Sequence, residues 1–352
     1  MYYNRNIIGF FIGFIITIIV LEVYLQVSEI NNLSNTKRHI NIGPILKPNH
    51  KFTYFNEGFS IGKVNKYGYY GKDYDYQKSE NVKRIALIGD SYVEGIQVFE
   101  RNHFRSKLEK LLNKGKVDNI YQVLNFGRSG FNLNDIYCYN KNFISSFEPS
   151  TKLVFISPGD LISRGKIESR PYAYIENNEI KIDYNLDNNS NNIFNLFRGK
   201  SIILGYINRS IQLIKNNKYK SILFGKLSHL INNDIKNIKN INKIKSLSEL
   251  KKKIILDLRK ENCIFVIHKE TTVSDYDYLI NEFIEFSKKN NINYIDLSPL
   301  FYKLKIQNIN FNYWPLAKSK GHFNEKGHTE IANYIYEYLK RNENKNNKRK
   351  KF

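Results

Sequence analysis

The stretch RIALIGDSYVEG, residues 84–95, joins an apolar run of strand length to a small polar turn. A short strand that turns directly into a helix holds the turn residue at the edge of a sheet, close to the N–H groups of the first helical turn. Such donors can stabilise an oxyanion, so Ser91 is a candidate nucleophile. The alternative is a serine that only caps the helix, because one tripeptide is a weak signal.

Strand-like and helix-like segments alternate along the rest of the chain. Strands are expected at residues 84–88, 121–125, 153–157, 263–268 and 293–296, and helices at 101–115, 246–262, 277–291 and 328–342. This alternation predicts an α/β fold with a mostly parallel sheet covered on both faces. Reactive groups gather at the carboxyl ends of such strands, which is where Ser91 stands.

A second polar element, SKGHFNEKGHTEIANYI at residues 319–335, places His322 in a loop before an amphipathic helix. In an open α/β sheet this loop can return to the first strand and bring the imidazole within reach of Ser91. His328 is the competitor, but it falls at the helix start, where capping or packing is favoured. A metal site of His322, Glu325 and His328 is disfavoured, because the two histidines lack the i, i+4 spacing of one helical face.

Taken in order, several blocks between about residues 60 and 340 resemble the SGNH/GDSL hydrolases. The blocks are VNKYGYYGKDY (64–74), KRIALIGDSYVEG (83–95), VLNFGRSGFNLND (123–135), VFISPGDLI (154–162) and GHFNEKGH (321–328). The first two look like a membrane-anchored bacterial branch of that family. The resemblance implies a flavodoxin-like three-layer sandwich.

The resemblance also implies roles for individual residues. Ser91 would be the nucleophile and His322 the general base, while the Ser91 N–H, Gly127 and Gly159 would form the oxyanion hole. No cofactor and no metal are implied. The implied activity is that of an O-acyl esterase or O-acetyltransferase on an acylated carbohydrate or other ester. The N-terminal anchor described below suggests a cell-envelope glycan as the substrate. The alternative is a non-catalytic SGNH-like subunit that binds glycan or assists assembly in a polysaccharide-modification system.

Two positions depart from the family pattern. The third block usually has an asparagine before its aspartate, and here Gly159 precedes Asp160. Family members also place an acid two or three residues before the histidine, where this chain has Lys320 and Ser319. We therefore expect a Ser91–His322 dyad without the usual orienting carboxylate, with a main-chain carbonyl holding the histidine tautomer.

The N-terminus carries an uncharged run from Ile7 to Leu21. A membrane span needs about 20 apolar residues, so Glu22 would lie at the interface. No small-x-small cleavage site follows, and an uncleaved anchor is expected over residues 1–28, with a cleaved signal peptide and a soluble protein as alternatives. The globular part is expected outside the cytoplasm. A single span cannot carry activated acetyl across a bilayer, so a transferase would need a multi-span acyl-donor partner.

The chain is basic, with 55 Lys+Arg against 33 Asp+Glu and a net charge of +22. Its richness in Asn, Ile, Tyr, Phe and Lys is the pattern expected from AT-biased codons, and the lysines are scattered. Nucleic acid is therefore not expected as a partner. Cys138 and Cys263 lie in helix-like and strand-like apolar contexts and are expected as small buried hydrophobes, with a disulfide between them as the minor alternative.

The expected organisation has four parts. An anchor at 1–28 is followed by an extracytoplasmic linker and entry segment at 29–80, an SGNH-like domain at 81–340 and a basic disordered tail at 341–352. Residues from about 165 to 245 are rich in Asn and Lys and break the α/β alternation. We expect this segment to be an insertion that could cover the site.

Overall fold

The structure is a computed structural model. It describes residues 2–27, 36–39, 41–54, 56–116, 120–162, 165–167, 169–186, 201, 203, 246–269 and 276–349. The chain forms two compact units, residues 1–36 with 188–244 and residues 37–187 with 245–352. In the first unit, helix α1 (Tyr2–Val27) is long and apolar enough to cross a membrane, with a mean hydropathy of 2.5 over residues 6–27. A signal sequence has the same properties.

The second unit is built on a five-stranded parallel sheet in the order β11-β10-β7-β5-β6. The strands are β5 (Val82–Gly89), β6 (Ile120–Gly127), β7 (Thr151–Ile156), β10 (Cys263–Ile267) and β11 (Tyr294–Asp296). Numbered along the chain, this order is 2-1-3-4-5, the flavodoxin-like arrangement. The predicted α/β class and three-layer sandwich are therefore confirmed.

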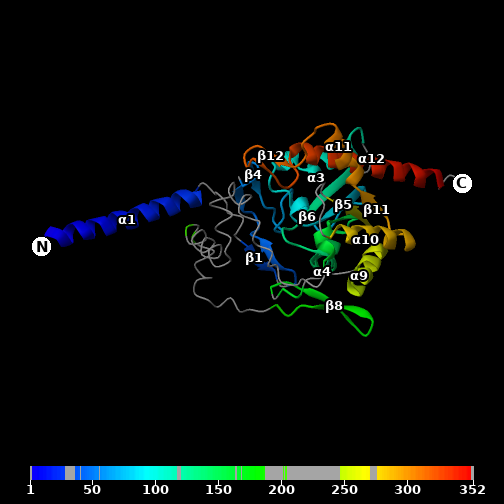
Figure 1. Ribbon diagram of the computed structural model, residues 1–352, viewed down its shortest axis with the longest axis horizontal. Helices are drawn as coiled ribbons and strands as arrows, with labels where there is room; N and C mark the ends of the chain where they lie inside the picture. Colours follow the sequence, from blue (N-terminus) through cyan, green and yellow to red (C-terminus); the bar gives the residue numbers. More distant parts are fainter. Residues whose placement is uncertain are drawn as a thin grey trace, which may run out of the picture. The chain divides into compact units, whose positions relative to one another are not determined.

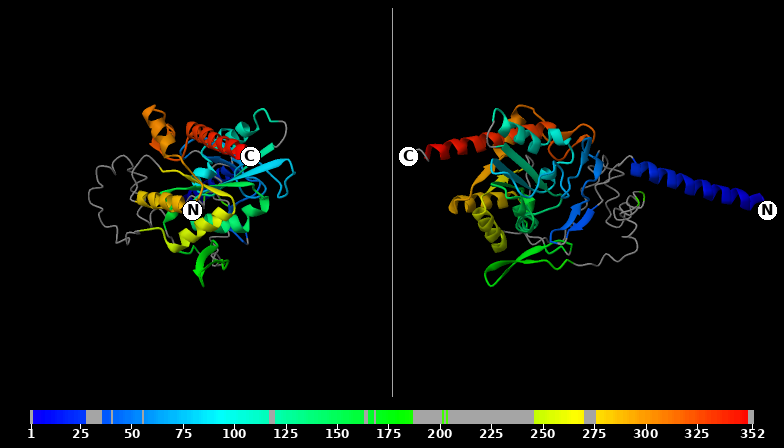
Figure 2. Two further views of the ribbon diagram at one scale, coloured as in Figure 1. Left: turned by 90° about the vertical axis from the view of Figure 1, so that its right-hand side faces the viewer. Right: turned by 180° about the vertical axis from the view of Figure 1, so that it is seen from behind.

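Helices cover both faces of the sheet (Figures 1 and 2). Helices α4 (Leu133–Asn142), α9 (Glu249–Lys260) and α10 (Asp277–Lys289) pack on one face, and α3 (Phe104–Asn113), α11 (Ser298–Ile306) and α12 (Glu325–Arg349) on the other. Side chains of β5 alternate between the two cores: Ala86 and Ile88 enter the first, and Ile85 and Leu87 enter the second. Burial on both faces explains why this strand is apolar throughout.

Residues 37–80 belong to the compact second unit, and they make up most of the segment 29–80 that was expected as a linker and entry segment. They include all but the first residue of β1 (Thr36–His39), followed by β2 (Gly43–Leu46), β3 (Lys51–Tyr54) and β4 (Ser60–Lys63). Ile42, Leu46 and Phe52 are buried, so this segment contributes apolar side chains to the domain. The sequence signal for this was weak, because the strands are only four residues long.

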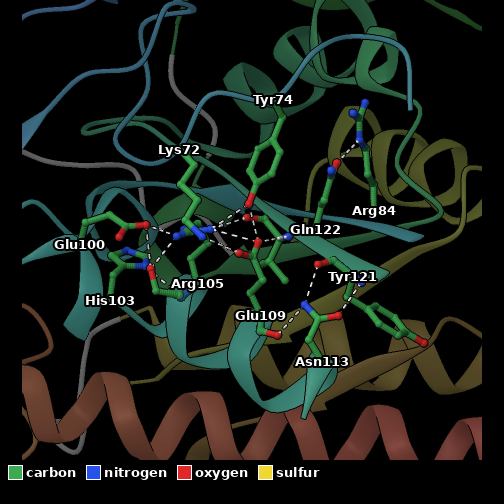
Figure 3. A network of polar contacts seen from close by, with 12 residues as sticks. Lys72, Tyr74, Arg84, Glu100, His103, Arg105, Glu109, Asn113, Tyr121 and Gln122 are labelled. Atoms are coloured by element: carbon green, nitrogen blue, oxygen red, sulfur yellow. Dashed lines mark hydrogen bonds and ion pairs between the residues drawn. The ribbon is translucent and has the colours of Figure 1, made fainter. Parts of the chain in front are cut away.

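A polar network fastens the same segment to the sheet (Figure 3). The Glu109 carboxylate accepts hydrogen bonds from the Tyr74 hydroxyl at 2.5 Å and from the Val123 N–H at 2.9 Å. Arg105, which is 1% exposed, donates to the Val123 carbonyl at 3.1 Å and pairs with Glu109 and Glu100. A buried guanidinium needs such partners, so the network fixes α3 against residues 72–74.

The remaining elements are short. They are α2 (Ser91–Glu94), the 3-10 turns at Glu100–Asn102, Ile144–Phe147 and Pro158–Leu161, and the hairpins β8 (Tyr172–Glu176) with β9 (Glu179–Asp183) and β12 (Tyr313–Trp314) with β13 (Ser319–Lys320). Most of the expected insertion, residues 187–200 and 204–245, lies outside the described residues.

Two further expectations meet different outcomes. Helix α12 continues to Arg349, so residues 341–349 are helical where a disordered tail was expected. Lys, Arg, Glu and Asn extend an existing helix at small cost, because only nucleation is strongly unfavourable. Cys138 and Cys263 are both free and buried, as expected of small hydrophobes.

Candidate active site

The turn after β5 is shaped by two glycines that the opening stretch contains. A Cβ atom at Gly89 would lie 2.5 Å from Val93 Cγ2, so only glycine lets the chain turn this closely into α2. Asp90 caps α2, its carboxylate accepting the Tyr92 N–H at 2.9 Å. Gly95 ends α2 with φ of 61°, a left-handed conformation that glycine adopts without strain. The result is a tight strand-to-helix turn that presents Ser91.

Ser91, His322 and Glu57 form a continuous hydrogen-bonded chain. The Ser91 hydroxyl lies 2.8 Å from His322 Nε2, and His322 Nδ1 lies 3.0 and 2.9 Å from the two carboxylate oxygens of Glu57. A carboxylate only accepts, so Nδ1 carries the proton and the lone pair of Nε2 faces the serine hydroxyl. This is the arrangement of nucleophile, base and orienting acid found in catalytic triads.

The presence of Glu57 corrects the expectation of a dyad. Ser319 and Lys320 are exposed in β13 and supply no acid, and the carboxylate comes instead from Glu57, in the bend after β3. The main-chain carbonyl of His322 accepts a hydrogen bond from Trp314 Nε1 at 2.8 Å. The His322 tautomer is held by the Glu57 side chain, which comes from the segment expected as a linker and entry segment, and not by a main-chain carbonyl.

Close packing explains how Glu57 reaches the histidine. A Cβ atom at Gly58 would lie 2.1 Å from Trp314 Cζ3, and one at Gly321 would lie 2.6 Å from Glu57 Oε1. Gly58 lies against the Trp314 ring, and a side chain at Gly321 would displace the Glu57 carboxylate from its place beside His322. The His322 N–H also donates to Glu57 at 3.3 Å, so the acid holds the loop and the ring together.

The surroundings of His322 raise its pKa above the ordinary value. Burial acts to lower the pKa, but the hydrogen bond and charge of Glu57, together with the charges of Asp90 and Glu94, outweigh it. The side chains of His322 and Glu57 are 25% and 21% exposed, so a substrate can reach the pair from solvent. Because the Glu57 carboxylate raises the pKa of His322, it stabilises the imidazolium that forms when Ser91 loses its proton.

His328 has a structural environment, as its position in the helix suggested. It is 1% exposed, and its Nδ1 accepts the Phe104 N–H at 3.2 Å. Its ring stacks on Phe104 and lies 4.7 Å from the ring of His103. Burial first, and then neighbouring positive charge from His103, hold its pKa well below the ordinary value. A neutral, fully buried ring of this kind packs the core and does not face Ser91.

The two glycines assigned to the oxyanion hole differ. A Cβ atom at Gly127 would lie 2.0 Å from the Glu94 backbone nitrogen, so this position must be glycine for α2 to approach β6. The Gly127 N–H donates to Asn125 Oδ1 at 2.9 Å, and is therefore engaged within its own strand end. Gly159 has more room: a Cβ atom there would meet only Ser157 Oγ, at 3.7 Å. The assignment of both glycines stays a prediction.

Beside Ser91 lies a buried polar group that sequence reasoning did not single out. Asp160 is 4% exposed, and its carboxylate accepts hydrogen bonds from the Ser157 N–H and hydroxyl, both at 2.7 Å. Burial, and then the charge of Asp90, raises the pKa of Asp160 to about 6. His268 is 2% exposed, and burial lowers its pKa to about 4.

Comparisons with known proteins give distant structural likenesses. No protein-family model and no curated protein matches the sequence. Similar solved structures include the acetyl xylan esterase AlAXEase, with 13% identity, a TM-score of 0.40 and coverage of 73% of this chain and 99% of that one. A lipase/acylhydrolase from Enterococcus faecalis has 12% identity, a TM-score of 0.40 and coverage of 73% and 95%.

A catalytic mutant of the acetylxylan esterase Axe2 from Geobacillus stearothermophilus has 11% identity and a TM-score of 0.39, with 74% of this chain and 94% of that chain covered. Likeness at this distance does not establish a shared activity. The order of the sheet and the pairing of Ser91 with His322, observed in this chain, agree with the resemblance to SGNH/GDSL hydrolases drawn from the sequence.

Proposed function

We propose that this protein is a serine hydrolase that cleaves O-acyl esters with a Ser91–His322–Glu57 triad. The observation that carries the proposal is His322, whose two ring nitrogens contact the Ser91 hydroxyl at 2.8 Å and the Glu57 carboxylate at 2.9 Å. One imidazole between a hydroxyl at a strand-to-helix turn and a carboxylate is the arrangement that nucleophilic acyl transfer needs. Binding of a glycan alone does not require the alignment of Ser91, His322 and Glu57.

The proposed reaction follows from these positions. Nε2 of His322 takes the hydroxyl proton while Ser91 Oγ attacks the ester carbonyl, and Glu57 stabilises the imidazolium. The imidazolium then returns the proton to the departing alcohol, leaving an acyl-serine. The Ser91 N–H is the first donor to the oxyanion, and Gly127 can be a second donor only if its N–H leaves Asn125 Oδ1.

Water or an alcohol then takes the acyl group from Ser91. With water the protein is an esterase, and with a sugar hydroxyl it is an acyltransferase that needs a membrane-embedded acyl donor. We propose an acylated cell-envelope glycan as the substrate and an extracytoplasmic location for the second unit. The support is the sequence resemblance, together with helix α1, which is long enough to span a membrane.

The proposal is tested by covalent labelling of the full-length protein in detergent. A fluorophosphonate should add one label, located by peptide mass spectrometry at Ser91, and an activated acetyl ester should be hydrolysed. Ser319 is an exposed serine in β13, and the variant Ser319→Ala is the matched control. This variant should be labelled at Ser91 at the wild-type rate. A folded wild-type protein that takes no label and hydrolyses nothing would support the glycan-binding subunit instead.

A further inference from the structure

The Asp90, Asp160 and His268 side chains meet at the carboxyl ends of three neighbouring strands. Asp90 follows β5, Asp160 lies in the 3-10 turn after β7, and His268 follows β10. These strands are adjacent in the sheet, which brings residues far apart in sequence to one point. One carboxylate oxygen of each aspartate and one ring nitrogen of His268 all lie within 4.8 Å of one another.

Asp160 and His268 are buried, Asp90 is half-buried, and the cluster is partly prearranged. His268 is 2% exposed, and its Nε2 has no hydrogen-bond partner among the described residues. A buried ring nitrogen without a partner is destabilising unless something binds it. One oxygen of Asp160 is fixed by two hydrogen bonds from Ser157, which is how supporting residues orient metal-ligating carboxylates.

The charge of the group favours a cation. Two carboxylates so close together repel each other in a buried site unless a proton or a cation lies between them. The buried Lys251 ammonium donates to the main-chain oxygen of Asp160 at 3.3 Å and offsets part of this repulsion, which leaves room for one further positive charge. A neutral imidazole nitrogen is a common metal ligand, so the unpartnered ring nitrogen of His268 can act as one.

We propose that Asp90, Asp160 and His268 bind one divalent first-row transition metal ion next to the Ser91 turn. Two carboxylate oxygens and one imidazole nitrogen suit Zn²⁺ or Mn²⁺, whereas Ca²⁺ and Mg²⁺ prefer oxygen ligands alone. Ligand atoms about 2.1 Å from a tetrahedrally bound zinc ion lie about 3.4 Å apart. The three ligand atoms lie within 4.8 Å of one another, so binding draws them together wherever their separation exceeds that distance.

The proposed ion would connect three strand ends and hold Asp90, the residue that caps α2. The readouts are metal binding and thermal stability, neither of which needs the Ser91 hydroxyl. Failure of this proposal can thus be distinguished from failure of the proposed ester hydrolysis.

The experiment uses the full-length protein in detergent, carrying an affinity tag without histidine. The protein is stripped with a chelator and then dialysed against micromolar Zn²⁺ or Mn²⁺. We expect one ion per chain by elemental mass spectrometry and a melting temperature raised by several degrees. His268→Gln and Asp160→Asn should each weaken binding at least about tenfold. His39 is a half-buried histidine outside the cluster, and the control variant His39→Gln should bind the metal ion as tightly as the wild type does.

Two outcomes would overturn the proposal. One is a wild-type protein that stays free of metal with an unchanged melting temperature. The other is His268→Gln binding the ion as tightly as the wild type. Should the variants fail to fold, X-ray absorption of the wild-type zinc complex decides, because the account requires a shell with one imidazole nitrogen and carboxylate oxygens. A thiolate, or several imidazoles, in that shell would place the metal elsewhere.

Discussion

His322 and His328 lie on either side of the start of α12, but they have opposite surroundings. His322 contacts a carboxylate and a serine hydroxyl, and its pKa is raised despite burial. His328 is stacked among aromatic rings, and burial holds its pKa well below the ordinary value. The pattern GHFNEKGH contains both residues and does not by itself distinguish them. The difference arises from Glu57, which the fold brings from the N-terminal part of the chain.

The largest expected effect is that of Ser91→Ala. It should abolish fluorophosphonate labelling and reduce ester hydrolysis by at least about 10⁴-fold, because no other described hydroxyl is hydrogen-bonded to His322. The melting temperature should change little, since Ser91 is only partly buried. Labelling that persists at another residue of the variant would show that the nucleophile is not Ser91.

Glu57→Gln should give the next largest effect. Loss of the orienting acid costs about 10⁴-fold in the serine-protease example, and we expect about 10³–10⁴-fold slower labelling here. Glu57→Asp should recover part of the rate, because the charge is kept while the reach is shortened. Stopped-flow or quenched labelling with mass detection measures all three proteins.

The matched control for Glu57 is Lys320→Asp, which places an acid where family members have one. Because Glu57 already occupies the Nδ1 side of His322, this change should leave the labelling rate within about threefold. A large acceleration by Lys320→Asp would mean that His322 lacks a working acid, and that the observed contact with Glu57 is not used.

The two histidines should separate in a third experiment. His328→Ala should lower the free energy of unfolding by about 2–4 kcal/mol, because it leaves a cavity and removes the acceptor of the Phe104 N–H. Its labelling rate below the melting temperature should stay within about tenfold of wild type. His322→Ala should slow labelling strongly and change the free energy of unfolding little. Denaturant titration and labelling rates of both variants test the contrast, and equal losses of labelling would contradict it.

The smallest expected effect is a gain. A Cβ atom at Gly159 would meet only Ser157 Oγ, at 3.7 Å, so the backbone there admits a side chain and Gly159→Asn restores the amide that family members have at this position. One oxyanion donor is worth about 10²–10³-fold in turnover where it is well aligned, and we expect about tenfold here. Gly159→Ala, which adds no donor, is the control. If Gly159→Ala also raised the turnover rate, the gain would come from a more rigid backbone and not from the added amide.

Sequence reasoning predicted what local patterns encode. The apolar strands are buried on both faces, and the turn at Ser91 and the loop at His322 meet because both lie at the carboxyl edge of the sheet. Glu57 was not predicted, because its contact with His322 joins segments distant in sequence, and an acid followed by glycine is common in bends. Arg105 and Glu109 are spaced i, i+4 on α3, but the contact of Glu109 with Lys72 is tertiary and has no local pattern.

The most direct test of the triad is the pH dependence of Ser91 labelling in the wild type and in Glu57→Gln. His322 acts as a base only when neutral, so labelling should rise with pH through its pKa. With Glu57 present that pKa is raised, and the acidic limb of the wild type should lie above pH 6.5. With glutamine in its place burial lowers the pKa, so the limb should move to lower pH while the plateau rate falls. Identical limbs and plateaus in the two proteins would contradict the account.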